Sequence, residues 1–373
     1  YNRFDHTNLT ELSASYTFNG KRKKIKMPSV APHQKGIIAI PAEKWEAGEP
    51  LLIEFFAADG TLVDAYQPIL GMQRVVYPEP MRGGKLQVTE SDEYITVKGD
   101  GFEIPFSKET GLMVGASVKG QELIDKGPLL NAYVNLNHLT GAEVRKMANC
   151  YRTTDYPWRK TSLGYVQQVD GILVNLSGIY DQTKVDFQIK ITGNGQLFID
   201  YLIDGLPNGY LRESGLTFSL SDAIHELAWK RKGYWNYYSE ESLSGNEGRT
   251  LLYASKQASY GQKPVQPWAD DTHNYYYWAD AGTNSERPLT QRAKGMKENI
   301  YYYSLFTVGE AEKHSLSVIA PDASVACRLE KLTDGKLLLH VNNRWDYPEI
   351  AWGNFCKKIE ALPCYGSITL YLK

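Results

Sequence analysis

Strict alternation of apolar and polar residues is the feature that most limits the folds open to this chain. Val185, Phe187, Ile189 and Ile191 alternate with polar residues, a Gly-Asn-Gly turn follows at 193–195, and the sequence QLFIDYLID then returns. Alternation of this kind places successive side chains on opposite faces of a β-strand. Two such runs joined by a short turn predict an antiparallel hairpin.

The hairpin pattern recurs along the whole chain. Residues 324–341 (SVACRLEKLTDGKLLLHV) predict a hairpin closed by Asp334-Gly335, and residues 51–66 (LLIEFFAADGTLVDAY) contain another Asp-Gly turn. Helical periodicity is nearly absent, and only residues 141–151 are compatible with a short helix. No repeat of propeller or solenoid length is present. The sequence therefore predicts an all-β protein.

The order of these hairpins predicts two domains. Residues 1–72 are expected to form a small immunoglobulin-like β-sandwich, in which the basic run 21–24 after Asn19-Gly20 is a solvated hairpin. Residues 73–84 contain two prolines and two glycines and are expected to be a linker. Residues 85–373 predict one large antiparallel β-sandwich, larger than an immunoglobulin domain.

Charge excludes several classes of partner. The chain has 41 Lys and Arg against 43 Asp and Glu, a net charge of -2, so neither nucleic acid nor an anionic membrane surface is an expected partner. No apolar run is long enough to span a bilayer. Because the chain starts at Tyr1 and shows no leader, we expect it to be a piece of a longer protein.

Known catalytic and metal-binding motifs are missing. There is no Walker loop, no G-x-S-x-G and no H-E-x-x-H, and Gly99-Asp100-Gly101 is expected to be a turn between strands. Metal and cofactor sites are therefore not expected. The cysteines at 150, 327, 356 and 364 lack C-x-x-C spacing and are expected to be free thiols, with a Cys356–Cys364 bridge as the alternative. The histidines are scattered, and candidates for a base in a sugar pocket are His138, His225 and His273.

Paired carboxylates could cleave a glycosidic bond if they flanked it. Glu240 and Glu241 are adjacent, as are Asp270 and Asp271. Neighbouring side chains of an extended chain point to opposite faces, so neither pair can act together on one bond. At most one member of each pair faces a pocket, and the alternative is that all four are loop acids that cap backbone amides.

Aromatic residues make up 12% of the chain, and many gather in three polar clusters at 234–238, 268–278 and 342–355. The intervening Asn, Asp and Gly residues place these clusters at loops or strand ends, where rings can contact sugars. Packing at the rim of the sheet is the alternative for each cluster. The candidates for carbohydrate contact are Trp235, Tyr237, Tyr238, Glu240, Trp268, Asp271, Trp345 and Trp352.

Short motifs in order along nearly the whole chain resemble the C-terminal part of β-galactosidases of glycoside hydrolase family 2. Residues 2–12 (NRFDHTNLTEL) are similar to the start of the immunoglobulin-like domain that follows the catalytic barrel. Residues 99–133 resemble the opening of the large C-terminal sandwich, and residues 229–256 stand where the family has a Gly- and Tyr-rich stretch. Residues 292–306 and 345–372 resemble the closing strands, seen best in members from gut bacteria.

This resemblance implies a galactose mutarotase-like large sandwich. It also implies that the catalytic glutamates belong to a (β/α)₈ barrel outside this chain. The chain would then be a non-catalytic accessory region that braces this barrel and contributes to the sugar pocket rim. Its expected partners are its own barrel and an oligo- or polysaccharide, with homo-oligomer formation left open and a periplasmic or secreted location favoured. Trp352 would take the place of a C-terminal tryptophan at the active-site mouth.

Two other functions stay open. Residues 132–146 lack the Arg- and Asp-Asn-bearing stretch of β-galactosidases, so galactose specificity is not implied. The first alternative is a free-standing carbohydrate-binding protein that uses the aromatic clusters. The second is a mutarotase-like epimerase or lyase, which would need a histidine and an acid converging on one concave face. Whether the chain is itself an enzyme is therefore left open.

Overall fold

A computed structural model describes residues 1–41, 44, 49–68, 70, 75–136, 150–233, 246–252, 296–308, 314–332, 334–345 and 364–373. The chain divides into two compact units, the first containing Tyr1–Val76 and the second Tyr77–Lys232 and the C-terminal strands. This division falls inside the segment 73–84. Apart from the short 3-10 helices η1 (Leu9–Glu11) and η2 (Thr153–Asp155), the regular structure of the described residues is all β, as predicted.

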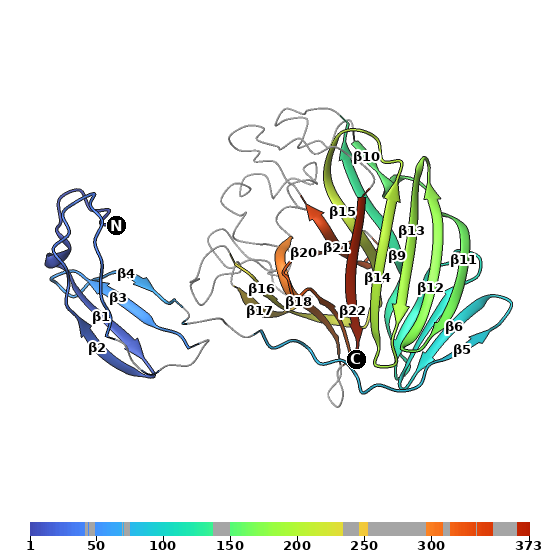
Figure 1. The fold of residues 1–373 in the computed structure, drawn as a ribbon, viewed down its shortest axis with the longest axis horizontal. Helices are drawn as coiled ribbons and strands as arrows, with labels where there is room; N and C mark the ends of the chain where they lie inside the picture. The colour runs from blue at the N-terminus through green and yellow to red at the C-terminus, as the bar shows by residue number, and fades with distance from the viewer. Residues whose placement is uncertain are drawn as a thin grey trace. The chain divides into compact units, whose positions relative to one another are not determined.

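The first unit contains a four-stranded antiparallel sheet in the order β2-β1-β3-β4 (Figure 1). Its strands are β1 (Ser13–Phe18), β2 (Lys21–Ile25), β3 (Leu52–Phe56) and β4 (Leu62–Tyr66). Asn19 and Gly20 have positive φ, which a two-residue hairpin turn requires, and the basic residues that follow are exposed, as expected. Within the described residues the strands of this unit form one sheet, so the immunoglobulin-like sandwich stays a prediction.

One face of this small sheet carries its core. Ala14, Tyr16 and Phe18 of β1 are buried, and Ile38 and Ile40 from the segment after β2 pack against them. The alternation seen in the sequence of β1 therefore corresponds to one buried and one more open face.

The second unit is built from two runs of antiparallel strands that belong to one hydrogen-bonded system. In order of pairing, the first run contains β11 (Arg159–Gln168), β12 (Gly171–Tyr180), β13 (Thr183–Ile191), β14 (Gln196–Asp204), β22 (Cys364–Leu372), β19 (Ser315–Ile319), β18 (Lys297–Thr307), β16 (Ile224–Arg231) and β17 (Glu247–Leu251). The second contains β5 (Gln87–Glu90), β6 (Tyr94–Gly99), β7 (Phe102–Ser107), β8 (Met113–Val118), β9 (Gln121–Asn135), β15 (Tyr210–Leu220), β21 (Leu337–Trp345) and β20 (Val325–Lys331).

Two further pairings complete this unit. Strand β20 also pairs with β18, and β10 (Cys150–Arg152) pairs with β9. The helix predicted over 141–151 is therefore wrong for its last two residues, because pairing with β9 holds them extended. Its residues before Cys150 lie outside the described part of the chain. No helix in that part is long and apolar enough to cross a membrane.

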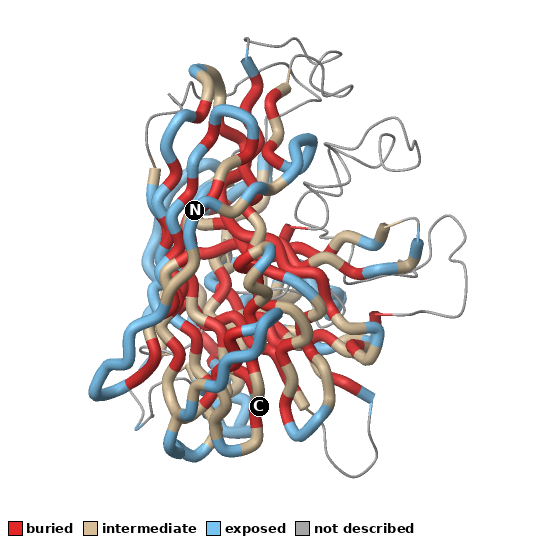
Figure 2. Tube along the Cα trace, turned by 90° about the vertical axis from the view of Figure 1, so that its right-hand side faces the viewer, coloured by how far each residue is buried: buried red, intermediate tan, exposed pale blue. Residues whose placement is uncertain are grey.

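The hairpin that was clearest in the sequence forms as predicted. Val185, Phe187, Ile189 and Ile191 of β13 are fully buried, whereas Gln188 between them is exposed. Figure 2 shows the same alternation of buried and exposed residues along neighbouring strands. Strands β13 and β14 therefore cover the core with one face and meet solvent with the other.

Strand β15 differs because both of its faces are buried. Leu216 and Phe218 point into the apolar core, and Glu213 and Thr217 lie on the opposite face, where they are also buried. The unit thus has a second buried face, and this face is polar.

No disulfide bond joins the cysteines among the described residues. Cys327 is fully buried, and burial raises its pKa far above the ordinary value, so this thiol is inert. Cys364 forms no disulfide with a described cysteine, and Cys356, its partner in the alternative bridge, lies outside the described residues.

Truncation of a core residue of β13 tests this architecture. We expect Ile189→Ala to lower the free energy of unfolding by about 2–5 kcal/mol, because the fully buried side chain leaves a cavity. The matched control Gln188→Ala on the exposed face should change it by less than about 0.5 kcal/mol. Urea unfolding measures both, and equal effects would contradict the assignment of faces.

Candidate functional site

The polar face of β15 is shared by its neighbours β9, β21 and β20. Thr217 is the register partner of His340, and His340 is the partner of Arg328 on the next strand. Directly opposed residues of an antiparallel pair point to the same side of the sheet. Pairing alone therefore brings a hydroxyl, an imidazole and a guanidinium into one row.

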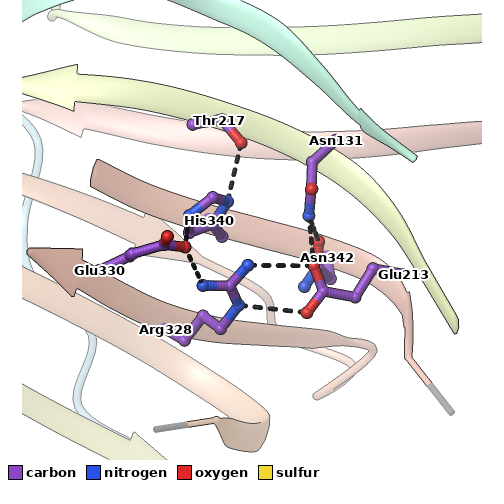
Figure 3. A network of polar contacts seen from close by, with 7 residues as sticks. All are labelled: Asn131, Glu213, Thr217, Arg328, Glu330, His340 and Asn342. Carbon is purple, nitrogen blue, oxygen red and sulfur yellow. Dashed lines mark hydrogen bonds and ion pairs between the residues drawn. The ribbon is translucent and has the colours of Figure 1, made fainter. Parts of the chain in front are cut away.

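Arg328 is at the centre of this face (Figure 3). Its Nε and Nη2 each donate to one oxygen of Glu213 over 3.1 Å, and its Nη1 donates to Glu330 Oε2 over 2.7 Å. The side chains of Arg328 and Glu213 are 2% and 0% exposed. Burial lowers the pKa of Arg328, but the two carboxylates outweigh it and raise the pKa above the ordinary value.

Asparagines complete the contacts of Glu213. Asn131 Nδ2 donates to Glu213 Oε2 over 2.7 Å and to Asn342 Oδ1 over 3.0 Å. Both oxygens of Glu213 therefore accept hydrogen bonds. Asn342 Nδ2 is buried and has no hydrogen-bond acceptor among the described residues, which is uncommon for a buried amide donor.

His340 links the network to β15. Its Nδ1 lies 2.8 Å from Thr217 Oγ1, and its Nε2 lies 3.0 Å from Glu330 Oε2 without hydrogen-bond geometry. Burial, reinforced by Arg328, lowers the pKa of His340 to about 4, so the imidazole is neutral at neutral pH. The close contact with His340 Nε2 and the charge of Arg328 hold the pKa of Glu330 well below its usual range.

Trp345 is the only sequence candidate for sugar contact that lies within the described residues. It is half-buried at the end of β21, and its register partner is Glu213, so it belongs to the same face. The other candidates, which are Trp235, Tyr237, Tyr238, Glu240, Trp268, Asp271 and Trp352, lie outside the described residues, as do His138 and His273. His225 lies on β16, on a different strand from the network.

Sequence reasoning missed the ionisable members of this face, which are Glu213, Arg328, Glu330 and His340. One signal was available for three of them. Counting outward from Leu332 and Lys336, which close the turn at Asp334-Gly335, places Arg328 opposite His340, with Glu330 on the same face of the hairpin. No cluster of potential metal ligands occurs among the described residues.

Comparison with known proteins adds a partial match. Over 172 residues the chain is similar to a β-galactosidase. That enzyme is from Streptococcus thermophilus, the identity is 29%, and the match covers 42% of this chain and 15% of the enzyme. No family model matches the chain.

Two solved structures overlap with the chain. The galactose 1-epimerase from Lactobacillus acidophilus NCFM has a TM-score of 0.37 and 11% identity over 78% of this chain and 99% of its own. The copper-containing benzylamine oxidase from Hansenula polymorpha has a TM-score of 0.37 and 8% identity over 86% of this chain and 70% of its own.

The lowered pKa of His340 predicts a pH dependence of stability. In the unfolded state the His340 imidazole binds a proton below about pH 6.5, whereas in the folded state it stays neutral down to about pH 4. The free energy of unfolding should therefore fall as pH drops through this window, by about 2 kcal/mol from His340 between pH 7 and pH 5.

Urea unfolding at both pH values measures this loss. His340→Gln should remove most of the difference, and the control His225→Gln, on a partly buried position of β16, should retain it. If the free energy of unfolding of His340→Gln still fell by the same amount between pH 7 and pH 5, His340 would not be the group that causes this loss.

Proposed function

We propose that this chain is a non-catalytic, carbohydrate-contacting region of a β-galactosidase-like glycoside hydrolase of family 2. In this function its main partner is the catalytic barrel of the same enzyme, and its polar face and aromatic clusters contribute to the rim of the sugar pocket. The partial match to a β-galactosidase and the ordered motifs along the chain support this proposal.

The buried polar face of β15 is the observation that carries the proposal. A buried ion pair is expensive to desolvate and adds little net stability, so an apolar face would serve packing as well. Here the partly exposed Glu330 carboxylate and the half-buried Trp345 ring lie on this face. Hydrogen-bonding groups beside an aromatic ring suit a sugar, which has hydroxyl groups at its edge and apolar C–H groups on its faces.

The carboxylates of this face are poorly suited to glycoside hydrolysis. That reaction needs a protonated carboxylic acid and a second carboxylate that is open to the sugar or to water. The low pKa of Glu330 leaves it without a proton to donate at neutral pH. Both oxygens of Glu213 already accept hydrogen bonds from Arg328 and Asn131. These contacts support an accessory role.

One observation favours a second function. A neutral His340 beside Glu330 meets the requirement of a mutarotase-like epimerase for a histidine and an acid on one face. A free-standing carbohydrate-binding protein would use the same contacts without a barrel.

Three measurements on the chain separate the two carbohydrate-binding functions from a glycosidase and from the epimerase. We expect no release of nitrophenol from p-nitrophenyl β-galactoside and no faster mutarotation of α-galactose by polarimetry. Lactose should bind in calorimetry, and Trp345→Ala should weaken binding about tenfold because an aromatic anchor is lost. The control Tyr94→Ala removes an exposed ring of β6 and should leave binding unchanged.

Two results would contradict the accessory role. Hydrolysis that is abolished by Glu330→Gln would make the chain a glycosidase. Mutarotation that is accelerated by the chain and lost in His340→Gln would favour the epimerase.

A further inference from the structure

A cavity of 430 Å³ lies beside the start of β22, and its described lining residues include none of Glu213, Arg328, Glu330 and His340. The turn between β19 and β20, the end of β21 and the first half of β22 form its walls. Its polar and aromatic lining consists of Asp322, Ser324, Asn343, Tyr365, Ser367 and Thr369. The volume falls within the range of small-molecule sites.

Asn343 is held rigidly in this cavity. It is the extra residue of a β-bulge in β21, where Ser214 and Gly215 are partnered by Arg344 and Asn342. Its Oδ1 accepts a hydrogen bond from Tyr201 over 2.8 Å, and its Nδ2 donates to the Ser367 carbonyl over 2.8 Å. An amide nitrogen carries two N–H groups, so Asn343 keeps one donor whose direction is fixed in advance.

The opposite wall is fixed as well. Asp322 Oδ1 accepts hydrogen bonds from the Ser324 amide over 3.2 Å and from the Ser324 hydroxyl over 2.7 Å, which order the turn after β19. The second oxygen of Asp322 has no hydrogen-bond donor among the described residues, and exposed carboxylates accept readily from hydroxyl groups.

Tyr365 supplies an aromatic platform at the mouth. Its side chain is 85% exposed, and its register partner on β14 is Leu202, also an exposed apolar residue. In Figure 1 these two strands lie side by side. An aromatic ring exposed next to fixed hydrogen-bonding groups matches a ligand that has both an apolar face and polar edges.

The charge of the lining residues restricts the classes of ligand that this cavity can bind. Among the described residues that line it there are one carboxylate and no lysine, arginine or histidine, so a phosphate, sulfate or carboxylate ligand would be repelled by Asp322. The geometry points to a second carbohydrate subsite, in which a neutral pyranose unit stacks on Tyr365 and hydrogen-bonds to Asn343 and Asp322. This inference rests on the proposed carbohydrate function, and it concerns a separate site.

Hydroxyl-radical footprinting of the chain tests both sites independently. Lactose is the probe, and glycerol at an equal concentration of hydroxyl groups is the control ligand. We expect lactose to protect Tyr365 from oxidation, glycerol to leave it unprotected, and Trp345 to report separately on the polar face. Protection of Trp345 alone would overturn the subsite and leave the proposed function standing, whereas protection of neither residue would overturn both.

Variants then identify the interaction. Tyr365→Ala should weaken lactose binding at this subsite about tenfold, and Tyr365→Phe, which keeps the ring, should stay within about twofold of the wild type. Because Tyr365 is exposed, both variants should fold, and Tyr94→Ala on β6 is the matched control. The stacking role would be refuted if lactose still protected the subsite of Tyr365→Ala from oxidation to the same extent. It would also be refuted if Tyr94→Ala lost as much lactose binding at the subsite as Tyr365→Ala.

Discussion

Burial of both faces of β15 sets the requirements for the strands around it. The apolar face is satisfied by the core, but Glu213 on the other face needs partners that are themselves charged or polar. Strand β20 supplies Arg328, and β9 supplies Asn131. A slip of one residue in the pairing would turn Arg328 toward the core and leave Glu213 unpaired, so this contact specifies the register of strands that are far apart in sequence.

The network also carries an excess of negative charge. Two carboxylates, Glu213 and Glu330, share the guanidinium of Arg328, while His340 stays neutral at neutral pH. Glu330 is the partly exposed member, with 36% of its side chain open to solvent, so the excess negative charge lies toward the solvent. This face therefore favours a neutral ligand over an anionic one. The cavity beside Tyr365 shares this preference, because Asp322 is the only charged residue among the described part of its lining.

Local pattern predicted the strands and turns well, because alternation and Asp-Gly or Asn-Gly turns act over a few residues. The hairpin closed at Asp334-Gly335 forms as expected. The contact of Asn131 with Glu213 spans 82 positions, and bulges shift the register on both sides of β15, so no local rule could locate it. Composition indicates binding sites in polar loops. The charged residues of the network instead lie within strands, at positions where a charged residue would be expected to face solvent, and they are buried there.

One such bulge connects the two candidate carbohydrate sites. Simple alternation from Asn342 would place Arg344 on the face of Glu213. The bulge adds Asn343, so Trp345 takes that position, and Arg344 becomes the partner of Ser214. The same extra residue carries its amide to Tyr201 and Ser367 at the wall of the cavity. A single inserted residue thus places an aromatic ring on the polar face and a fixed amide in the cavity. A bulge of this kind redirects side chains while the strand pairing on either side of it is kept.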